Sequence, residues 1–301
     1  RALVECAIDL SLWQEGPLSR YWHERDGEGR EGKRKTKEIV GGLFGRIDAM
    51  RRDPARYDDF QVNPPDRSRT IHIQSLGDER LLGRCPCPVS GEKTRCCNLM
   101  TLDAVRQCGF ACSYCSIQSF YHGDGILFAP DLHERLQTMV LPEGTWHIGT
   151  GQSSDSLMWG NAHGVLDAIA AFARTHPEVV VELKTKSART DWIGNPVFPG
   201  NVVATWSLNA PTIASKEEHG AASVERRLEA ALRASEAGLP VGFHLHPMVH
   251  FAGWEAEYAA LIERVTRLFD PTRVVMISLG TLTFTKEVLR QLRMSGRQSR
   301  I

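Results

Sequence analysis

The chain has no cysteine after Cys115, no excess of either charge and no long apolar run. Its 36 Lys and Arg residues are balanced by 36 Asp and Glu residues, and this balance argues against strong non-specific binding of a polyanion. No stretch approaches the about 18 apolar residues of a membrane-spanning helix, so we expect no membrane partner. The sequence has neither a starting methionine nor a signal-like apolar segment at Arg1, so we infer no targeting from it.

Cysteines are concentrated in one part of the chain. Seven of the eight lie between Cys85 and Cys115, and the other is Cys6. Disulfides that stabilise a secreted domain are normally spread through its fold. Crowding in one stretch indicates metal binding in a reducing compartment instead, so we expect a cytoplasmic protein.

Two regions differ in their residue pattern, and we expect an N-terminal region over residues 1–97 and a second domain over residues 98–301. The N-terminal region is polar and irregular and contains a Cys-rich loop. Apolar spacing predicts a helix over Lys37–Arg52, and a short edge strand is expected at Thr70–Ile73. The basic stretch Lys33–Lys37 is typical of a solvated surface.

From residue 98 onward, expected strands alternate with expected helices, which is typical of parallel strands joined by crossovers. The strands are expected at 99–105, 145–149, 179–184, 202–208, 241–245 and 274–279, and the helices at 162–175, 223–237, 254–269 and 286–294. Six strands in this arrangement predict an α/β fold, with a parallel sheet wound into a partial barrel behind an irregular, partly helical N-terminal region. An open doubly wound sheet is the alternative.

A C-x3-C-x2-C triplet, Cys108, Cys112 and Cys115, follows the first expected strand. Three thiolates at this spacing can bind three irons of a [4Fe–4S] cluster and leave the fourth iron open to another ligand. The alternatives are a structural zinc site, which normally has four ligands, and three unrelated buried thiols.

With Tyr114 before its last cysteine, this triplet resembles the signature of the radical S-adenosylmethionine superfamily. The resemblance implies a partial (β/α)6 radical SAM barrel, a [4Fe–4S] cluster and S-adenosylmethionine as cofactor. It also implies reductive cleavage of that cofactor to a 5′-deoxyadenosyl radical, which abstracts a hydrogen atom from the substrate. An electron donor such as flavodoxin or ferredoxin would be required.

Within the superfamily, the segment Asn98–Lys286 is similar to the spore photoproduct lyase family. The similarity rests on short strings in a shared order, such as Gly151-Gln-Ser-Ser-Asp-Ser156 and Glu218-His-Gly-Ala-Ala-Ser223. It implies cofactor-binding roles for residues that follow or end the expected strands: Gly149, Gly151, Ser154, Asp155, Lys186 and Ser207. Hydroxyl and ammonium groups suit the methionine carboxylate, Asp155 could bind the amino group or order the loop, and the glycines could admit the adenosyl group. Loop capping and ordinary turn formation are the alternatives.

One position departs from the family. The lyase uses a cysteine shortly before its cofactor-binding serine as a hydrogen-atom donor, and here Gln152 occupies the corresponding place. We therefore expect a small-molecule or saccharide substrate that undergoes epimerisation or rearrangement. The alternative is lyase-type repair of thymine lesions in DNA, with a donor thiol from Cys96 or Cys97 and with phosphates bound near Lys33–Lys37. A metal-stabilised binding module without enzymatic activity is a third possibility.

Two further groups of residues are candidate functional sites. Cys85, Cys87, Cys96 and Cys97 could bind a second metal centre, either iron–sulfur or zinc, and reduced structural thiols are the alternative. His246 ends an expected strand and is a candidate catalytic residue for substrate binding or proton transfer. A structural, hydrogen-bonded pair with His244 is equally compatible with the sequence.

Overall fold

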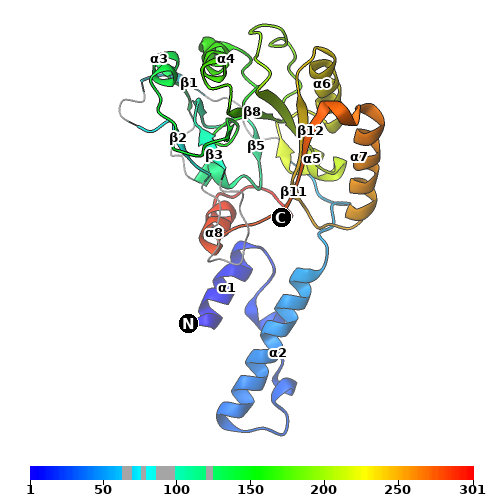
Figure 1. Ribbon diagram of the computed structural model, residues 1–301. Coiled ribbons are helices and arrows are strands. Elements are labelled where there is room, and N and C mark those ends of the chain that lie inside the picture. The colour runs from blue at the N-terminus through cyan, green and yellow to red at the C-terminus, as the bar shows by residue number, and fades with distance from the viewer. Residues whose placement is uncertain (63–69, 76–78, 86–98, 120–124) are drawn as a thin grey trace.

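The computed structural model describes residues 1–62, 70–75, 79–85, 99–119 and 125–301, and a seven-stranded sheet organises them (Figure 1). The strand order is β12-β11-β9-β8-β7-β3-β2, with β2 antiparallel at one edge and the other six strands parallel. The strands are β2 (Leu82–Arg84), β3 (Met100–Leu102), β7 (His147–Gly149), β8 (Val180–Thr185), β9 (Val202–Ser207), β11 (Val241–Met248) and β12 (Val274–Thr281). The α/β fold and its six parallel strands are confirmed.

Helices connect most of these strands on one side of the sheet: α3 (Leu132–Gln137), α4 (Val165–Thr175), α5 (Pro211–Lys216), α6 (Val224–Glu236) and α7 (Trp254–Leu268). Helix α6 begins where the Ser223 side chain accepts a hydrogen bond from the Arg226 N–H, and it packs against β9 and β11. Residues 186–201, between β8 and β9, contain no helix. Buried Trp192 instead anchors this crossover, and its Nε1 donates to the Arg189 carbonyl at 2.8 Å.

The two faces of the sheet differ in chemistry. Side chains of β7, β8, β9 and β11 meet at Glu182 on the concave face, which carries many polar groups. The outer face is apolar and is largely covered by the helices. Strand β12 differs from the others, because its outward residues Val275, Ile277 and Leu279 are 53%, 55% and 63% exposed.

The N-terminal region forms an arm that projects from the sheet (Figure 1). It contains α1 (Ala2–Leu12), which was not expected from the sequence, and α2 (Gly32–Arg52), which begins five residues before the expected helix. Leu10, Leu43 and Ile47 form part of its own small core. Helix α8 (Lys286–Met294) joins the arm to the barrel, because Arg290 pairs with Asp9 at 2.8 Å.

Strand β2, from residues 1–97, pairs with β3, from residues 98–301, so both expected regions contribute strands to the same sheet. The expected strand 99–105 is also split. Its end, β4 (Val105–Arg106), belongs to a separate three-stranded sheet with β6 (Ile126–Phe128) and the expected edge strand β1 (Ile71–Ile73). Among the described residues, no helix is both long and apolar enough to cross a membrane.

Candidate active site

The cysteine triplet lies on a loop that is held on two sides. Strand β5 (Ala111–Cys112) pairs antiparallel with β10 (Glu218–His219), which buries Cys112. On the other side, the Cys108 Sγ lies 4.0 Å from the Met158 Sδ. A Cβ on Gly109 would lie 2.4 Å from the Met158 methyl group, so this glycine permits the close approach. The loop after β7 and the cysteine loop therefore pack against each other.

The three cysteines are free of disulfides and interact electrostatically with one another. Burial raises the pKa of Cys108, and the charges of Asp155, Cys112 and Cys115 raise it further. Burial also raises the pKa of Cys112 to about 12, although the nearby Lys186 ammonium opposes the shift. Such thiols need a positive partner before they ionise, and iron provides one. The donor set therefore suits a cationic metal cluster.

A single metal ion fits this loop less well. Among the described residues, no three His, Cys, Asp or Glu side chains are grouped closely enough to hold one ion. In a [4Fe–4S] cluster each thiolate binds a different iron, so the three sulfur atoms need not converge on one point. For the expected second metal centre, Cys85 is half-buried, and Cys87, Cys96 and Cys97 lie outside the described residues.

Glu218, to which the sequence analysis assigned no role, lies at the centre of the contacts behind the cysteine loop. It is buried and pairs with the fully buried Arg227 at 2.5 Å, and it also accepts a hydrogen bond from the Tyr114 hydroxyl. Burial opposes ionisation of Glu218, but the charges of Lys186 and Arg227 prevail and lower its pKa. The Lys186 ammonium lies 3.9 Å from Glu218 Oε1 and 5.9 Å from the Tyr114 ring centroid. The structure thus brings Lys186 to the cysteine loop.

Asp155 orders the loop that follows β7. Its Oδ1 accepts hydrogen bonds from the Thr185 hydroxyl at 2.6 Å and from the backbone N–H groups of Leu157 and Met158 at 3.0 and 2.8 Å. Its Oδ2 accepts from the Lys186 N–H at 2.6 Å. Burial raises its pKa, and these bonds oppose the shift. These hydrogen bonds connect the loop after β7 to the end of β8.

The other expected cofactor residues lie at the same ends of the strands. Ser154 is buried and its Oγ accepts from Trp159 Nε1 at 3.3 Å, and Ser207 is buried at the end of β9. A Cβ on Gly151 would lie 2.5 Å from the Lys184 carbonyl oxygen, and one on Gly149 would lie 2.8 Å from Leu99. Within the described chain, both glycines therefore permit close packing of the protein itself, which is a different reason from the expected approach of an adenosyl group.

The expected histidine pair lies on the concave face. His246 Nε2 is 3.0 Å from the Ser278 Oγ, and the His244 and His246 rings are 5.6 Å apart in an edge-to-face arrangement. Burial lowers the pKa of His246 to about 4, with the charge of Lys184 adding to the shift, so the ring is neutral near pH 7. His244 contacts Glu182, and sequence analysis missed this carboxylate because nothing in its strand marks it as inward-facing.

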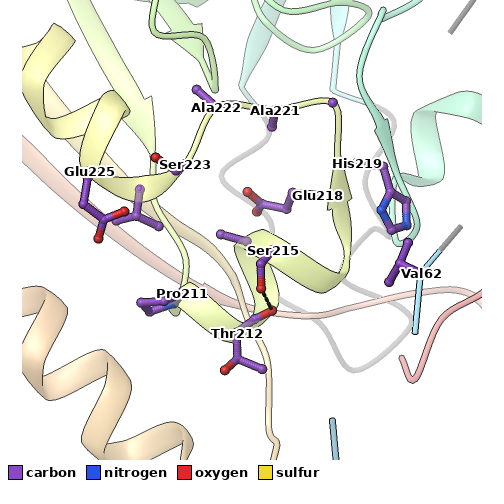
Figure 2. A pocket seen from close by; sticks show the side chains of 13 residues that line it. Val62, Pro211, Thr212, Ser215, Glu218, His219, Ala221, Ala222, Ser223 and Glu225 are labelled. Carbon is purple, nitrogen blue, oxygen red and sulfur yellow. Dashed lines mark hydrogen bonds between the residues drawn. The ribbon is translucent and has the colours of Figure 1, made fainter. Parts of the chain in front are cut away.

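A separate hollow of about 640 Å³ lies between α5, β10 and the start of α6 (Figure 2). Thr212 and Ser215 of α5 line one side, and Ser223, the N-cap of α6, and Glu225 in its first turn line another. Glu218 also lines the hollow, so it connects this space to the strand that pairs with the cysteine loop.

Comparisons with known proteins identify relatives of one kind. The chain is 31% identical over 108 residues to spore photoproduct lyase of Bacillus subtilis (strain 168), covering 35% of this chain and 32% of that protein. It is 28% identical over 100 residues to spore photoproduct lyase of Geobacillus sp. (strain Y412MC61), covering 33% and 28%. The chain therefore matches about a third of the length of these curated relatives.

Solved structures show the same fold. Spore photoproduct lyase complexed with dinucleoside spore photoproduct aligns with a TM-score of 0.61 at 17% identity, covering 84% of this chain and 77% of that chain. A variant of the lyase with bound AdoMet and the same dinucleoside aligns with a TM-score of 0.57 at 20% identity, covering 66% and 62%. These likenesses confirm the expected radical SAM fold.

A family model described as spore photoproduct lyase matches residues 144–294. This segment runs from just before β7 to the end of α8 and includes Ser154, Lys186, Ser207 and Glu218. Because the model covers half of the sequence, the chain belongs to the spore photoproduct lyase family.

Proposed function

We propose that this chain is a radical S-adenosylmethionine enzyme that acts as a lyase on a thymine lesion in DNA. The main support is the convergence of the cysteine loop, the Asp155-ordered loop and Lys186 at the ends of the parallel strands. Cys108, Cys112 and Cys115 would hold a [4Fe–4S] cluster with one open iron. When bound, the cluster would supply the electron for reductive cleavage of S-adenosylmethionine.

The residues of the chain itself would bind and orient the cofactor. Lys186 and the hydroxyls of Ser154 and Ser207 are proposed to bind the methionine carboxylate, because ammonium and hydroxyl groups donate hydrogen bonds to it. Asp155 would act indirectly, by holding the backbone of Lys186 and of the loop after β7.

The choice of substrate follows the relatives. The expected small-molecule or saccharide substrate, with epimerisation, has no support among them, whereas both of the lyase structures described above contain dinucleoside spore photoproduct. The alternative, repair of a thymine lesion in DNA, is therefore the better proposal. The exposed basic stretch of α2, which includes Lys33, Lys35 and Lys37, is a candidate for contact with DNA phosphates.

A hydrogen-atom donor is still required, because Gln152 has no thiol. We retain Cys96 and Cys97 as the proposed donors, since an S–H bond is weak enough to donate hydrogen to a carbon radical. Replacing both with alanine should abolish the repaired product while 5′-deoxyadenosine still forms. Repair by the double variant at the wild-type rate would exclude these thiols.

Anaerobic reconstitution tests the proposed chemistry directly. The reconstituted protein, reduced with dithionite in place of flavodoxin or ferredoxin, should convert S-adenosylmethionine to 5′-deoxyadenosine, as measured by chromatography. Cys112→Ala should abolish this product. Cys6→Ala is the matched control, because Cys6 is also a buried free thiol but lies in the core of the arm. Metal binding without 5′-deoxyadenosine would favour a non-enzymatic module.

The substrate is tested with the same protein. A dinucleoside thymine lesion should be converted to two thymines. Deuterium placed on the lesion carbon from which the hydrogen atom is abstracted should appear in 5′-deoxyadenosine. If 5′-deoxyadenosine forms but the lesion is neither bound nor converted, the radical assignment stands and the proposed substrate is wrong.

A further inference from the structure

The concave face of the sheet carries a buried network that the proposed cofactor residues do not use. Glu182, on β8, is 1% exposed, yet it contacts side chains from three other strands. Its Oε2 lies 3.0 Å from His147 Nε2, and its Oε1 lies 2.5 Å from His244 Nε2. The Thr205 hydroxyl donates to Oε1 at 2.6 Å. A carboxylate buried this deeply is costly unless its partners are retained.

The charges in this network define the state of His244. Burial would raise the pKa of Glu182, but hydrogen bonds from His147 and His244, with the Thr205 hydroxyl, outweigh it and hold that pKa far below the usual range. Burial lowers the pKa of His244, although the Glu182 contact opposes the shift. The carboxylate is therefore ionised and the imidazole neutral near pH 7. The proton of neutral His244 must lie on Nε2, which donates to Glu182, so Nδ1 is an acceptor.

That acceptor is buried and has no hydrogen-bond partner among the described residues. His244 itself is 6% exposed. A buried polar atom without a partner is destabilising, and native structures contain few of them. The hydrogen-bonding capacity of this ring nitrogen is therefore unused within the described chain.

Strand register places His244 beside the proposed cofactor site. His244 is the register partner of Ser207 on β9 and of Ser278 on β12. The Leu208 N–H donates to the His244 carbonyl at 2.8 Å, which fixes this part of β11 against the end of β9. His246 lies on the same face two residues nearer the strand end, where Gly280 leaves room for its ring.

We propose that His244 Nδ1 accepts a hydrogen bond from an N–H group of the substrate, the imide N–H of a thymine ring, and that Glu182 is the positioning residue that fixes the tautomer. This inference rests on the proposed function, because it takes a thymine lesion as the substrate. A thymine ring presents one N–H donor between two carbonyl groups. A neutral imidazole acceptor complements that donor, whereas a protonated imidazole would not.

An N3-methylated analogue provides the test. The reconstituted protein with S-adenosylmethionine and an oxidised cluster, which prevents turnover, is titrated by calorimetry with a dinucleoside thymine lesion and with the same lesion methylated at its imide nitrogens. The wild type should bind the methylated ligand about tenfold more weakly, because the Nδ1 acceptor is then buried without a donor.

Two substitutions of His244 distinguish the roles of its two ring nitrogens. His244→Gln keeps a donor to Glu182 but loses the acceptor at Nδ1, so the ratio of the two dissociation constants should fall to near one. His244→Asn keeps an amide oxygen close to the Nδ1 position and should retain more of the ratio. Glu182→Gln should also lower the ratio. If Glu182 were purely structural, its substitution would weaken the binding of both ligands equally. The exposed His250→Gln is the control and should leave the ratio unchanged.

The outcomes distinguish this inference from the proposed function. If the wild type repairs the lesion but His244→Gln discriminates against the methylated ligand as strongly as the wild type, the role of His244 is refuted and the function stands. Equal affinity of the wild type for both ligands would also refute the role of His244 and leave the proposed function standing. If the wild type neither binds nor repairs the lesion, both the function and the inference are wrong.

Discussion

The carboxylate of Asp155 accepts a hydrogen bond from the backbone N–H of Lys186 at 2.6 Å, which ties the loop after β7 to the end of β8. The same carboxylate holds Met158, whose sulfur touches the Cys108 thiol. A single side chain thus aligns the proposed carboxylate-binding lysine with the cysteine loop. Its effect on the cofactor is indirect, through the backbone.

Asp155→Asn should therefore weaken S-adenosylmethionine binding by about tenfold or more. An amide has one acceptor oxygen for the four donors that Asp155 satisfies, so at least one N–H loses its partner, at a cost of about 1–3 kcal/mol. Equilibrium dialysis with the reconstituted protein measures the affinity. Asp191→Asn is the control, since Asp191 is exposed and pairs with Arg189 in the following loop. Equal affinity in the two variants would contradict the ordering role.

Glu218→Gln should lower the free energy of unfolding by about 3–5 kcal/mol, because it leaves the buried Arg227 charge without its counter-ion. Urea denaturation measures the change. Glu229→Gln, an exposed position on α6, the helix that carries Arg227, should change stability little. The double variant with Arg227→Gln should be more stable than Glu218→Gln alone, because the uncompensated charge is then removed. A double variant that is less stable would argue against this explanation.

Stability should fall on mild acidification because of His246. Burial lowers its pKa from 6.5 to about 4 in the folded chain, so between these values the unfolded chain binds more protons. This contribution is complete above pH 6.5 and is lost as the pH falls towards 4, with a loss of about 1–3 kcal/mol. Urea denaturation of the wild type and of His246→Gln at pH 7.5 and pH 5 measures it. The variant should lose less stability between the two pH values. An equal loss would mean that His246 titrates normally.

The basic stretch of α2 should contribute to DNA affinity in a salt-dependent way. Lys33→Ala with Lys37→Ala should reduce the slope of log affinity against log salt by about 2, if each lysine neutralises one phosphate. Fluorescence anisotropy with a lesion-containing duplex measures this slope. Arg264→Ala with Arg267→Ala removes the same charge from the exposed side of α7 and is the control. Equal slopes in both double variants would exclude the arm as a specific DNA contact.

Much of the fold could be predicted because hydrophobic patterning was strong where strands and helices alternate. Helix α6 matches its expected bounds within one residue, since a Ser223 cap begins it and Gly238 follows it with a positive φ of 91°. Helix α1 was missed, because only Cys6 and Leu10 are buried there and the helix depends on packing within the arm. Local pattern does not encode such packing.

The candidate site was predictable only in part. The cysteine spacing and the residues at strand ends identified the loops that come together. The roles of Glu218 and Glu182 required tertiary structure, since each carboxylate is stabilised by partners distant in sequence, such as His244 for Glu182. The local sequence does not indicate that a glutamate side chain faces the inside of the sheet and is paired with distant residues.

The exposed apolar side of β12 affects how the protein can be handled. Strand β12 lies at one edge of the described sheet and carries the exposed side chains of Val275, Ile277 and Leu279. An edge strand of this kind presents both an apolar surface and backbone hydrogen-bonding groups to other molecules. Concentrated samples of the chain should therefore self-associate through this side. Ile277→Lys would be the first substitution to try against this association before crystallisation.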